Sequence, residues 1–475
     1  MTGTTADGQQ SLAWRIVVPA LAVLLGAAAA GRAQDSQYWD IQYGPVGQLL
    51  GGQVVGSTRD LSATYYNPGG LALADNPEFL LSVQGFSMRT FTIKPTGGGE
   101  FLNTSITDFD TFPGFVAFSF PDSWFGKRTR MAFSVLTRQQ LNLRMDQRFA
   151  GDTAAGGGRY GLETLFDERM SETWGGLTLS HRLSDTVGLG ATLYGIYRGQ
   201  RVRWEQNLQV NNADASGITA QVVDDFDYSH WQLLGKLGVA WEGRTTRLGL
   251  AVTTPSAGLF GSGKAGFTRS ATGVDLNGDG HPESLLLNGL DENLQSTYKS
   301  PWSVSAGGSW RRGSLQVHAT GEWFASVGTF DVLRGQTATS TGGPITLVQS
   351  LKSVFNAGAA VEYWLGGVSA ERGPSAGATA VYASVRTDFS ASPEVRADEA
   401  ATSNQDLYHV TGGTAFNLGS SRFSLGLEYT FGSKSFDFLL AGLPPAVPVI
   451  GQGLPVQTRT SRWVFMLGYL FGSGK

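Results

Sequence analysis

The chain has 475 residues, of which 65 are glycine and only 16% are charged. A mean hydropathy of -0.09 fits neither a disordered chain nor a bundle of membrane helices. The net charge of -4 argues against a nucleic-acid partner, and the lack of cysteine excludes disulfides, thiol chemistry and cysteine-based metal sites. This composition favours an all-β protein, a transmembrane antiparallel β-barrel in which lipid-facing apolar residues alternate with polar residues facing a lumen.

Residues 1–33 have the pattern of an export signal. Arg15 precedes the apolar run 16–30, which is shorter than the roughly 20 residues needed to span a bilayer. Gly31 and Ala33 place small residues before a cut at Gln34, as signal peptidase requires. The alternative is an N-terminal helical anchor. The later chain contains no comparably long apolar run, so we expect no other membrane helix.

Residues 34–78 show no sustained periodicity and contain a strong turn signal. In Asn67-Pro68-Gly69-Gly70, proline fixes φ and removes a donor, while glycine accepts positive φ. Small and polar residues, including Asp60, precede this turn and suit tight packing in a confined space. We expect residues 34–78 to form a hatch that plugs a barrel built from residues 79–475.

From residue 79 onward, apolar and polar residues alternate along the chain. Leu315 and Val317, for example, share one face of a strand, and Gln316 and His318 share the other. In the same way, Met131, Phe133, Val135, Leu141, Leu143 and Met145 share one parity and are expected on one face. The pattern continues to the end of the chain, which favours a barrel over a single half-buried strand.

The alternating segments define about fourteen strands. We expect them at 79–94, 112–120, 129–149, 158–184, 187–210, 225–242, 246–269, 284–311, 314–335, 347–366, 377–392, 406–419, 421–438 and 458–472. Tight links alternate with longer ones, as the short periplasmic turns and long outer loops of outer-membrane barrels do. An even number of strands places both termini in the periplasm.

Several stretches resemble the FadL-type outer-membrane transporters of long-chain fatty acids and aromatic hydrocarbons. Residues 60–72 resemble the family's Asn-Pro-Ala hatch segment, with Gly69 in place of the alanine. Residues 247–263 look like the family's mid-barrel strand with its Ser-Pro or similar break, and 299–308 and 321–330 look like the next two strands. The resemblance implies a fourteen-stranded barrel with an N-terminal plug. It also implies passive diffusion of hydrophobic compounds, without ATP or TonB coupling, and a sideways exit through the wall. The short polar loop 211–224 departs from the long apolar capture loops of the family.

A sideways exit requires a place where the strand ladder fails. Pro255 is a candidate because proline removes a ladder donor, and Gly85 is another because glycine often marks a bulge. The alternation of the first strand changes parity at Gly85-Phe86, which predicts such a bulge. The alternative for either residue is a local kink without a gate.

Four arginines on predicted inward positions are candidates to receive a fatty-acid carboxylate. They are Arg138, Arg144, Arg203 and Arg386. The alternative is that they pair with carboxylates in the lumen, such as Asp146, Asp388 or Glu428.

The stretch 275–283 has the spacing of a calcium loop. Oxygen-bearing side chains recur at alternate positions around a glycine, and the candidate ligands are Asp275, Asn277, Asp279, His281 and Glu283. The glutamate at position 12 of a full EF-hand is missing, because Leu286 stands there. A calcium ion here would stiffen an outer loop, and the alternative is an unoccupied polar turn. No other cofactor is required.

The leading hypothesis is passive transport of hydrophobic compounds across the outer membrane of a Gram-negative cell. The alternatives are a structural or adhesive barrel that transports nothing, and a barrel lipid hydrolase, for which His318 with Glu322 is the pair to examine. The expected partners are outer-membrane lipid and lipopolysaccharide, a hydrophobic small molecule and the barrel assembly machinery, with no nucleic acid.

Overall fold

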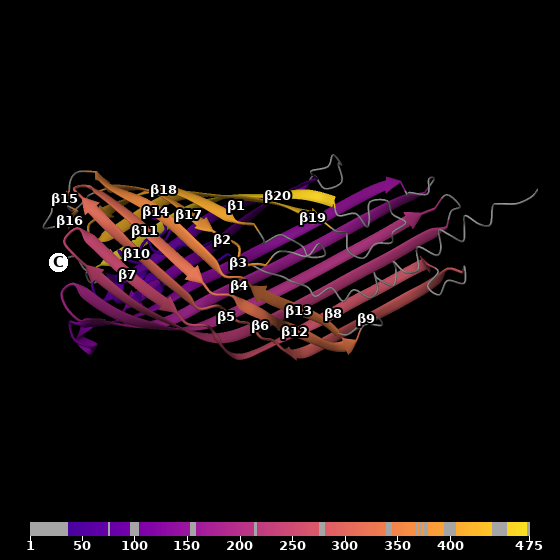
Figure 1. Ribbon diagram of the computed structural model, residues 1–475, viewed down its shortest axis with the longest axis horizontal. Coiled ribbons are helices and arrows are strands. Elements are labelled where there is room, and N and C mark those ends of the chain that lie inside the picture. Colours follow the sequence, from indigo (N-terminus) through magenta and orange to yellow (C-terminus); the bar gives the residue numbers. More distant parts are fainter. Residues whose placement is uncertain are drawn as a thin grey trace, which may run out of the picture.

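The structure is a computed structural model that describes residues 37–74, 77–95, 104–152, 158–212, 216–274, 281–338, 344–365, 368–369, 373–374, 379–393, 405–438 and 454–472. The predicted export signal, residues 1–33, lies outside these ranges. Strands make up 76% of the structure (Figure 1). The elements are α2 (Ala63–Tyr66), α3 (Pro68–Leu71), β1 (Pro77–Pro95), β2 (Thr104–Ser119), η1 (Asp122–Trp124), β3 (Thr129–Asp152), β4 (Arg159–Arg182), β5 (Val187–Asn211), β6 (Gly217–Glu242), β7 (Thr246–Thr253), β8 (Ala257–Val274), β9 (Glu283–Gln295), β10 (Ser303–Arg312), β11 (Leu315–Phe324), β12 (Val327–Ala338), β13 (Pro344–Leu351), β14 (Val354–Leu365), β15 (Val368–Ser369), β16 (Gly373–Pro374), β17 (Thr379–Asp388), β18 (Leu407–Leu418), β19 (Ser421–Phe438) and β20 (Leu454–Gly472).

The strands close into an antiparallel barrel. The ladder runs β5-β4-β3-β2-β1-β20-β19-β18-β17-β14-β11-β10-β7-β6, and pairing of β5 with β6 completes the ring. Residues 236–242 of β6 pair with β7, and residues 219–233 pair with β8, so β7 and β8 occupy one position in the wall. We call the end of the barrel at the β6–β7 turn the lower end and the opposite end the upper end. The strands β9 and β10 share the next position, because β9 pairs with β8 and β10 pairs with β7. The wall therefore has 14 strand positions, as the sequence predicts.

The hairpin β12–β13 forms a separate two-stranded sheet. Its buried apolar side chains include Val332 and Ile345, and they pack with apolar side chains from the inner faces of the long strands β3–β6, β8 and β9. We call this group the upper-lumen cluster; its buried members are Phe91, Leu143, Met145, Phe166, Val202, Phe226, Tyr228, Ala265, Phe267, Leu294, Phe330, Val332, Leu333, Ile345 and Leu347. In Figure 1 these long strands extend beyond the ends of β10, β11 and β14.

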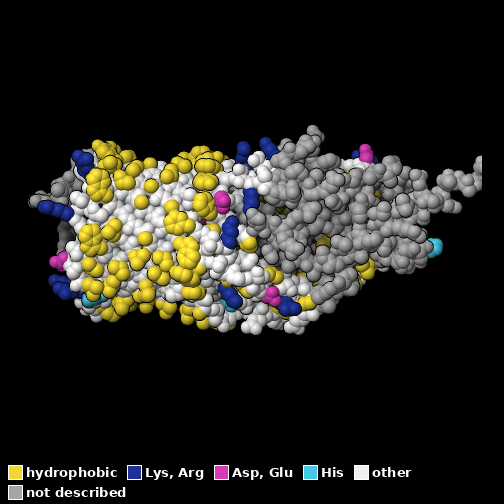
Figure 2. Space-filling model, in the orientation of Figure 1, with side chains coloured by type: hydrophobic (Ala, Val, Ile, Leu, Met, Phe, Trp, Pro, Cys, Tyr) yellow, Lys and Arg dark blue, Asp and Glu magenta, His cyan; other side chains and the backbone are white. Residues whose placement is uncertain are grey.

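The outer face of the barrel carries an apolar band. Leu177, Leu193 and Leu237 alternate with buried inward residues and are 47%, 59% and 57% exposed. Inward positions of the same strands are polar and bonded, as in the 2.8 Å hydrogen bond between the hydroxyls of Thr178 and Thr192. On the face shown in Figure 2, hydrophobic side chains cover one half of the barrel, and Lys and Arg side chains lie at its edges. This distribution is typical of a barrel that sits in a lipid bilayer.

Strand β3 departs from its expected parity. Its register against β4 shifts between Thr137 and Gln139, which makes a bulge at Arg138. Below the bulge Ala132 is buried and Val135 is exposed, whereas above it Leu143 and Met145 are buried. The expectation that Met131 and Met145 share one face was therefore wrong, because one extra residue moves every later side chain to the other face.

The N-terminal residues 37–74, which we call the hatch segment, lie within the ring of strands. They contain only the single-turn helices α2 and α3, and almost every residue is buried. Their apolar side chains, such as Leu49, Leu61 and Leu71, form one cluster with inward residues of the wall, including Phe115 and Tyr194. Within the described ranges, no helix is long and apolar enough to cross a membrane.

Candidate functional site

The predicted turn at Asn67-Pro68 ties the hatch segment to the wall. The Asn67 side chain accepts a hydrogen bond from the Gly69 N–H at 3.1 Å, and Pro68 begins α3, where a missing N–H costs nothing. The Asn67 amide donates to the carbonyls of Val55 and Val239, both at 2.8 Å. One side chain thus joins two parts of the hatch segment to strand β6.

Glycine at position 69, where the resemblance leads us to expect alanine, has a steric reason. A Cβ on Gly69 would lie 2.7 Å from the Gly188 carbonyl oxygen and 2.8 Å from that of Gly238. The wall also has a glycine here, Gly238, and a Cβ on this residue would lie 2.8 Å from Pro68. Glycines on both surfaces therefore let the hatch backbone approach the inner wall closely.

Asp60 stabilises the fold of the hatch segment itself. Its carboxylate accepts hydrogen bonds from the Ser62 N–H at 2.8 Å and from the Ser62 hydroxyl at 2.5 Å. Burial raises the pKa of the Asp60 carboxyl, although these hydrogen bonds oppose the shift.

The wall is interrupted between β2 and β3. These strands pair only from Phe115–Leu136 to Ser119–Ala132. Beyond Phe115, β2 continues to pair with β1 as far as Thr104, and β3 continues to pair with β4 as far as Asp152. Among the described residues no ladder pair joins β2 to β3 above Phe115 and Leu136. We call this interruption the β2–β3 gap.

A second interruption lies at Pro255, which separates β7 from β8 at Thr254–Ser256, and residues 296–302 likewise separate β9 from β10. Local hydrogen bonds bridge this Pro255 break. The Ser300 N–H donates to the Ser256 hydroxyl at 2.8 Å, and the Thr254 N–H donates to the Gly235 carbonyl at 2.8 Å.

Gly85 lies at a bulge, as the sequence predicts. The register of β1 shifts between Gln84 and Ser87 against β2, and between Gln84 and Phe86 against β20. Both ladders resume beyond the bulge. Gly85 therefore bends the wall and leaves it closed.

A small cavity lies between the hatch segment and the wall. This central cavity has a volume of about 50 Å³, and half of its lining residues are aromatic or aliphatic, among them Tyr65, Trp174 and Phe324, while the other half are polar or charged. Two cations, Arg138 and Lys236, also line it. Both are buried, at 6% and 5% exposure.

The two cations lie against aromatic rings. Arg138 lies 5.8 Å from the centre of the Trp174 ring, and Lys236 lies 4.6 Å from that of Tyr65. The Arg138 Nη1 group is buried without a hydrogen-bond partner among the described residues. Such an orphan donor has a strong affinity for an anion, because burial has removed its water.

The carboxylates of the central cavity are already engaged by other donors. Glu172 accepts hydrogen bonds from Arg198 and Trp174, both at 2.8 Å. Glu322 accepts from the Trp39 indole at 2.8 Å and from the Ser303 hydroxyl at 2.7 Å. The cavity therefore combines two cations with two carboxylates, and the Arg138 Nη1 donor is the group left for the anionic head of a ligand.

An ion-pair cluster fixes the start of the hatch segment to strands β17–β20. We call it the anchor cluster: Asp40, Arg386, Asp388, His409, Glu428 and Arg462. Arg462 donates to both oxygens of Asp40, one of them at 2.9 Å, and Arg386 donates to Glu428 at 2.7 Å. Burial alone raises the pKa of Asp40, but Arg462 outweighs it and lowers the pKa to about 2.

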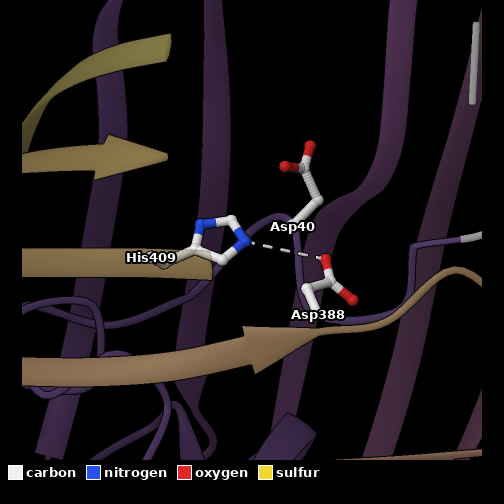
Figure 3. A group of neighbouring side chains, drawn as sticks. All are labelled: Asp40, Asp388 and His409. Carbon is white, nitrogen blue, oxygen red and sulfur yellow. Dashed lines mark ion pairs between the residues drawn. The ribbon is translucent and has the colours of Figure 1, made fainter. Parts of the chain in front are cut away.

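Figure 3 shows three members of the anchor cluster, Asp40, Asp388 and His409, whose ligand atoms lie within 4.8 Å of one another. The His409 Nε2 atom lies 3.8 Å from one oxygen of Asp388, and the Tyr38 and Trp39 N–H groups donate to the other oxygen of Asp388 at 3.1 and 3.0 Å. The guanidinium of Arg462 occupies both oxygens of Asp40, and that of Arg386 lies 3.1 Å from the His409 ring. Two adjacent guanidinium groups repel a divalent cation, so this geometry suits an anchor rather than a metal site.

The four predicted arginines separate into two groups. Arg138 and Arg386 are buried and face the lumen, but Glu428 already occupies Arg386. The inward orientation expected for Arg144 and Arg203 was wrong. Arg144 is exposed because the bulge at Arg138 reversed the parity of β3. Arg203 lies on the outer face of β5 and pairs with Glu205 at 2.9 Å.

Of the predicted calcium loop, Asp275, Asn277 and Asp279 lie outside the described residues. His281 is exposed and Glu283 begins β9.

The sequence analysis did not identify Lys236 as a residue of the site. The pattern that could have identified it is a single lysine between Leu234 and Leu237, at a position of an alternating strand whose side chain faces the lumen.

The predicted pair of His318 with Glu322 is not the contact that forms. His318 instead lies 2.9 Å from the Ser57 hydroxyl, and its other ring nitrogen lies 3.6 Å from Glu362. This order of residues resembles a Ser-His-Glu triad. Ser57 is 8% exposed and lines none of the three described cavities, so the triad has no visible place for a substrate.

No family model and no curated protein matches this chain. Solved structures do match its fold. A FadL homologue from Pseudomonas aeruginosa aligns at 12% identity with a TM-score of 0.60, covering 92% of this chain and 100% of that one. The toluene transporter TodX of Pseudomonas putida aligns at 14% identity with a TM-score of 0.56, covering 92% and 100%. The toluene transporter TbuX of Ralstonia pickettii aligns at 13% identity with a TM-score of 0.51, covering 90% and 98%.

The chain is thus a closed, fourteen-stranded β-barrel whose lumen holds an N-terminal segment. Its barrel is the fold of the FadL homologue and the toluene transporters, and the resemblance predicted from the sequence is confirmed at the level of the fold.

Proposed function

We propose that the protein is a passive transporter of hydrophobic compounds in the outer membrane of a Gram-negative cell. The observation that carries this proposal is the β2–β3 gap, beside a lumen filled with apolar side chains. A water-filled pore has a polar interior, whereas the upper-lumen cluster is apolar. A hydrophobic solute gains free energy by leaving water for such a surface.

The path begins at the upper-lumen cluster and passes toward the hatch segment. Leu143 and Met145 of β3, on one edge of the β2–β3 gap, belong to this cluster. A further cavity of about 70 Å³ lies beside the anchor cluster, where Phe91 of β1 and Leu143 of β3 line it together with polar residues such as Arg462. Because Leu143 also lies at the edge of the β2–β3 gap, the proposed exit for the cargo is sideways through this gap into the bilayer.

The two cations of the central cavity favour cargo with an anionic head. A long-chain fatty acid places its carboxylate between Arg138 and Lys236 and its chain against the aromatic walls. The cavity of about 50 Å³ is smaller than such a ligand. Binding therefore requires the hatch segment or the β12–β13 hairpin to shift, since Tyr38 and Leu351 close the cavity from those two elements.

The proposal includes the location and partners expected from the sequence. The export signal and the apolar band support insertion into the outer membrane, with lipopolysaccharide around the outer leaflet and the barrel assembly machinery during biogenesis. A calcium ion at 275–283 would stiffen one outer loop and takes no part in transport.

Uptake of labelled oleate by cells that lack the gene, and by the same cells expressing the protein, tests this function. We expect uptake to require the protein. We also expect uptake to fall in the Arg138→Met, Lys236→Met variant, because this variant lacks both cations that bind the oleate carboxylate. Equal uptake with and without the protein would overturn the proposal and leave the structural or adhesive barrel as the better reading. Release of free fatty acid from a labelled phospholipid, lost on Ser57→Ala substitution, would favour the hydrolase.

A further inference from the structure

A shallow cavity lies on the outer face of the barrel, across strands β3, β4, β5, β6, β8 and β9. Its volume is about 880 Å³, and most of the side chains that line it face outward, although the inward-facing Met170, Gln200 and Tyr228 also border it. Its floor and rims come from outward-facing residues of neighbouring strands. Cross-strand pairing arranges these residues in three parallel rows.

The lower row is aromatic. Tyr197, Trp231 and Phe260 are cross-strand neighbours on β5, β6 and β8. Their ring centres lie 5.0 Å and 6.1 Å apart, and each side chain points outward. Aromatic rows of this kind mark the boundary between the apolar band and the lipid head groups.

The middle row is small. Two residues farther along each strand, Ser171, Gly199, Ser229 and Ser262 stand opposite one another. Side chains of this size leave a depression between the rows on either side. This row forms the floor of the cavity.

The upper row is charged. Arg169, Arg201, Asp227 and Lys264 follow in the next outward positions and again face one another across the strands. The side chains of the three cations are 65%, 53% and 45% exposed. Arg169 and Arg201 are direct cross-strand neighbours, an arrangement of like charges that destabilises a sheet unless an anion lies between them.

Four carboxylates, Asp167, Asp225, Asp227 and Glu292, lie around the three cations of the upper row, and the ion pairs that Arg201 and Lys264 form with them are long. Arg201 lies 3.9 Å from Asp225, and Lys264 lies 3.8 Å from Asp227, both beyond hydrogen-bond distance. Asp167 accepts a hydrogen bond from Arg169 at 3.3 Å, and Glu292 lies at the β9 edge of the cavity. The donors of Arg201 and Lys264 are therefore available to a ligand.

We propose that this cavity binds a phosphorylated glycolipid of the outer leaflet, with a sugar phosphate against Arg169, Arg201 and Lys264. The sugar ring rests on the row of small residues, and the acyl chains run down past the aromatic row along the apolar band. The charged row lies at the level expected for the lipid head groups of the outer leaflet. Arg201 lies fourteen residues beyond the start of β5 at Val187, farther than the roughly 9–11 residues that cross the bilayer. The assignment requires only that the barrel sits in the outer membrane, and it holds whether or not the lumen carries cargo.

Binding of purified bisphosphorylated lipid A to the full-length protein in detergent tests the assignment. We expect the triple variant Arg169→Gln, Arg201→Gln, Lys264→Gln to weaken this binding about tenfold or more, because charge-assisted contacts to phosphate are lost. The matched control is Arg148→Gln, Arg159→Gln, Arg334→Gln, which removes the same charge from side chains that are 75%, 78% and 66% exposed outside the cavity. The control should change binding by less than about twofold.

Three further probes distinguish the ligand. Dephosphorylated lipid A should bind the unaltered protein about as weakly as lipid A binds the triple variant, and neither phosphatidylglycerol nor inorganic phosphate should displace lipid A. Unchanged lipid A binding by the triple variant would overturn the proposal, as would an equal loss in the control. Displacement by phosphatidylglycerol would show a site for anionic lipids in general, and displacement by inorganic phosphate would show a site for the free ion. Either result contradicts a glycolipid site.

Discussion

The β2–β3 gap and the Pro255 break interrupt the same wall at different heights. Strands β2 and β3 pair over five residues from the turn that joins them, and these residues rise about 13 Å along the axis of a barrel whose strands tilt by about 40°. Strand β7 has 8 residues below its break, and these rise about 20 Å at the same tilt. With an apolar band about 25 Å tall, the gap begins near mid-membrane and the break lies near the outer edge.

The two interruptions also differ in how their free backbone groups are satisfied. At the Pro255 break, Ser256, Gly235 and Gly261 accept hydrogen bonds that close the wall locally. At the β2–β3 gap, each strand is paired among the described residues only with its other neighbour. The proline therefore marks a bend that local hydrogen bonds close, while the missing ladder pairs mark the place of the proposed exit.

Locking the β2–β3 gap should have the largest effect on transport. Gly114 and Thr137 occupy the next rung beyond Phe115–Leu136, and the chain has no cysteine of its own. In the Gly114→Cys, Thr137→Cys variant, we expect oxidation to reduce oleate uptake to that of cells without the protein, and reduction to restore it. The corresponding pair at the Pro255 break, Phe260→Cys with Thr297→Cys, is the control and should keep most of its uptake. The opposite result would move the exit to the Pro255 break.

Removing the two cations of the central cavity should have the next largest effect. We expect Arg138→Met and Lys236→Met each to weaken oleate binding about tenfold, since each removes a charge-assisted contact in a desolvated site. Binding of an uncharged hydrocarbon such as toluene should not change. The matched control is Arg334→Met, whose side chain is 66% exposed. An equal loss of toluene binding would show that the cavity lost its shape and not a carboxylate contact.

A methyl group at Gly69 should loosen the hatch segment from strands β5 and β6 of the wall. Because its Cβ would lie 2.7 Å from a backbone oxygen of β5, we expect Gly69→Ala to destabilise this segment by about 1–3 kcal/mol. Amide hydrogen exchange of residues 55–70 measures the effect. Gly328→Ala is the control, since a Cβ there meets nothing within 4 Å. Unchanged exchange in Gly69→Ala would contradict the close fit.

Lowering the pH should destabilise the part of the hatch segment that is held by the anchor cluster, and we expect this to be the smallest of the four effects. The pKa of Asp40 is about 2 in the folded protein and 3.8 ordinarily, so its contribution is complete above pH 4 and disappears as the pH falls toward 2. Arg462, Arg89 and His409 lower the pKa of Asp40, and Asp388 and Glu428 are the other carboxylates of the anchor cluster. We expect a loss on the order of 2 kcal/mol, measured by hydrogen exchange of residues 37–43 against pH.

The variant Asp40→Asn should lack this loss. Asp60→Asn is an informative comparison, because burial raises the pKa of Asp60, and its ionisation destabilises the fold as the pH rises. The two variants should therefore change the pH profile in opposite directions. Parallel profiles would contradict the ion pair between Asp40 and Arg462.

The alternating sequence by itself determined the barrel. Each strand exposes alternate side chains to lipid and lumen, so the period of two fixes the strands and their number without knowledge of their neighbours. The turn at Asn67-Pro68 was also readable, because the conformations of proline and glycine are local properties. Glycine at position 69 in place of the family's alanine was visible in the sequence, but its reason, the backbone of β5 and β6, was not.

Only the tertiary structure decided which residues form the site. One bulge at Arg138 reversed the parity of β3 and turned Arg144 outward, although the residue types around it give no sign of the change. Arg138 of β3 and Lys236 of β6 line the same cavity. The β2–β3 gap is a stretch in which the two strands have no ladder pairs among the described residues. A strand records its own two faces in its sequence, whereas ladder pairs and contacts across a lumen depend on segments distant in the chain.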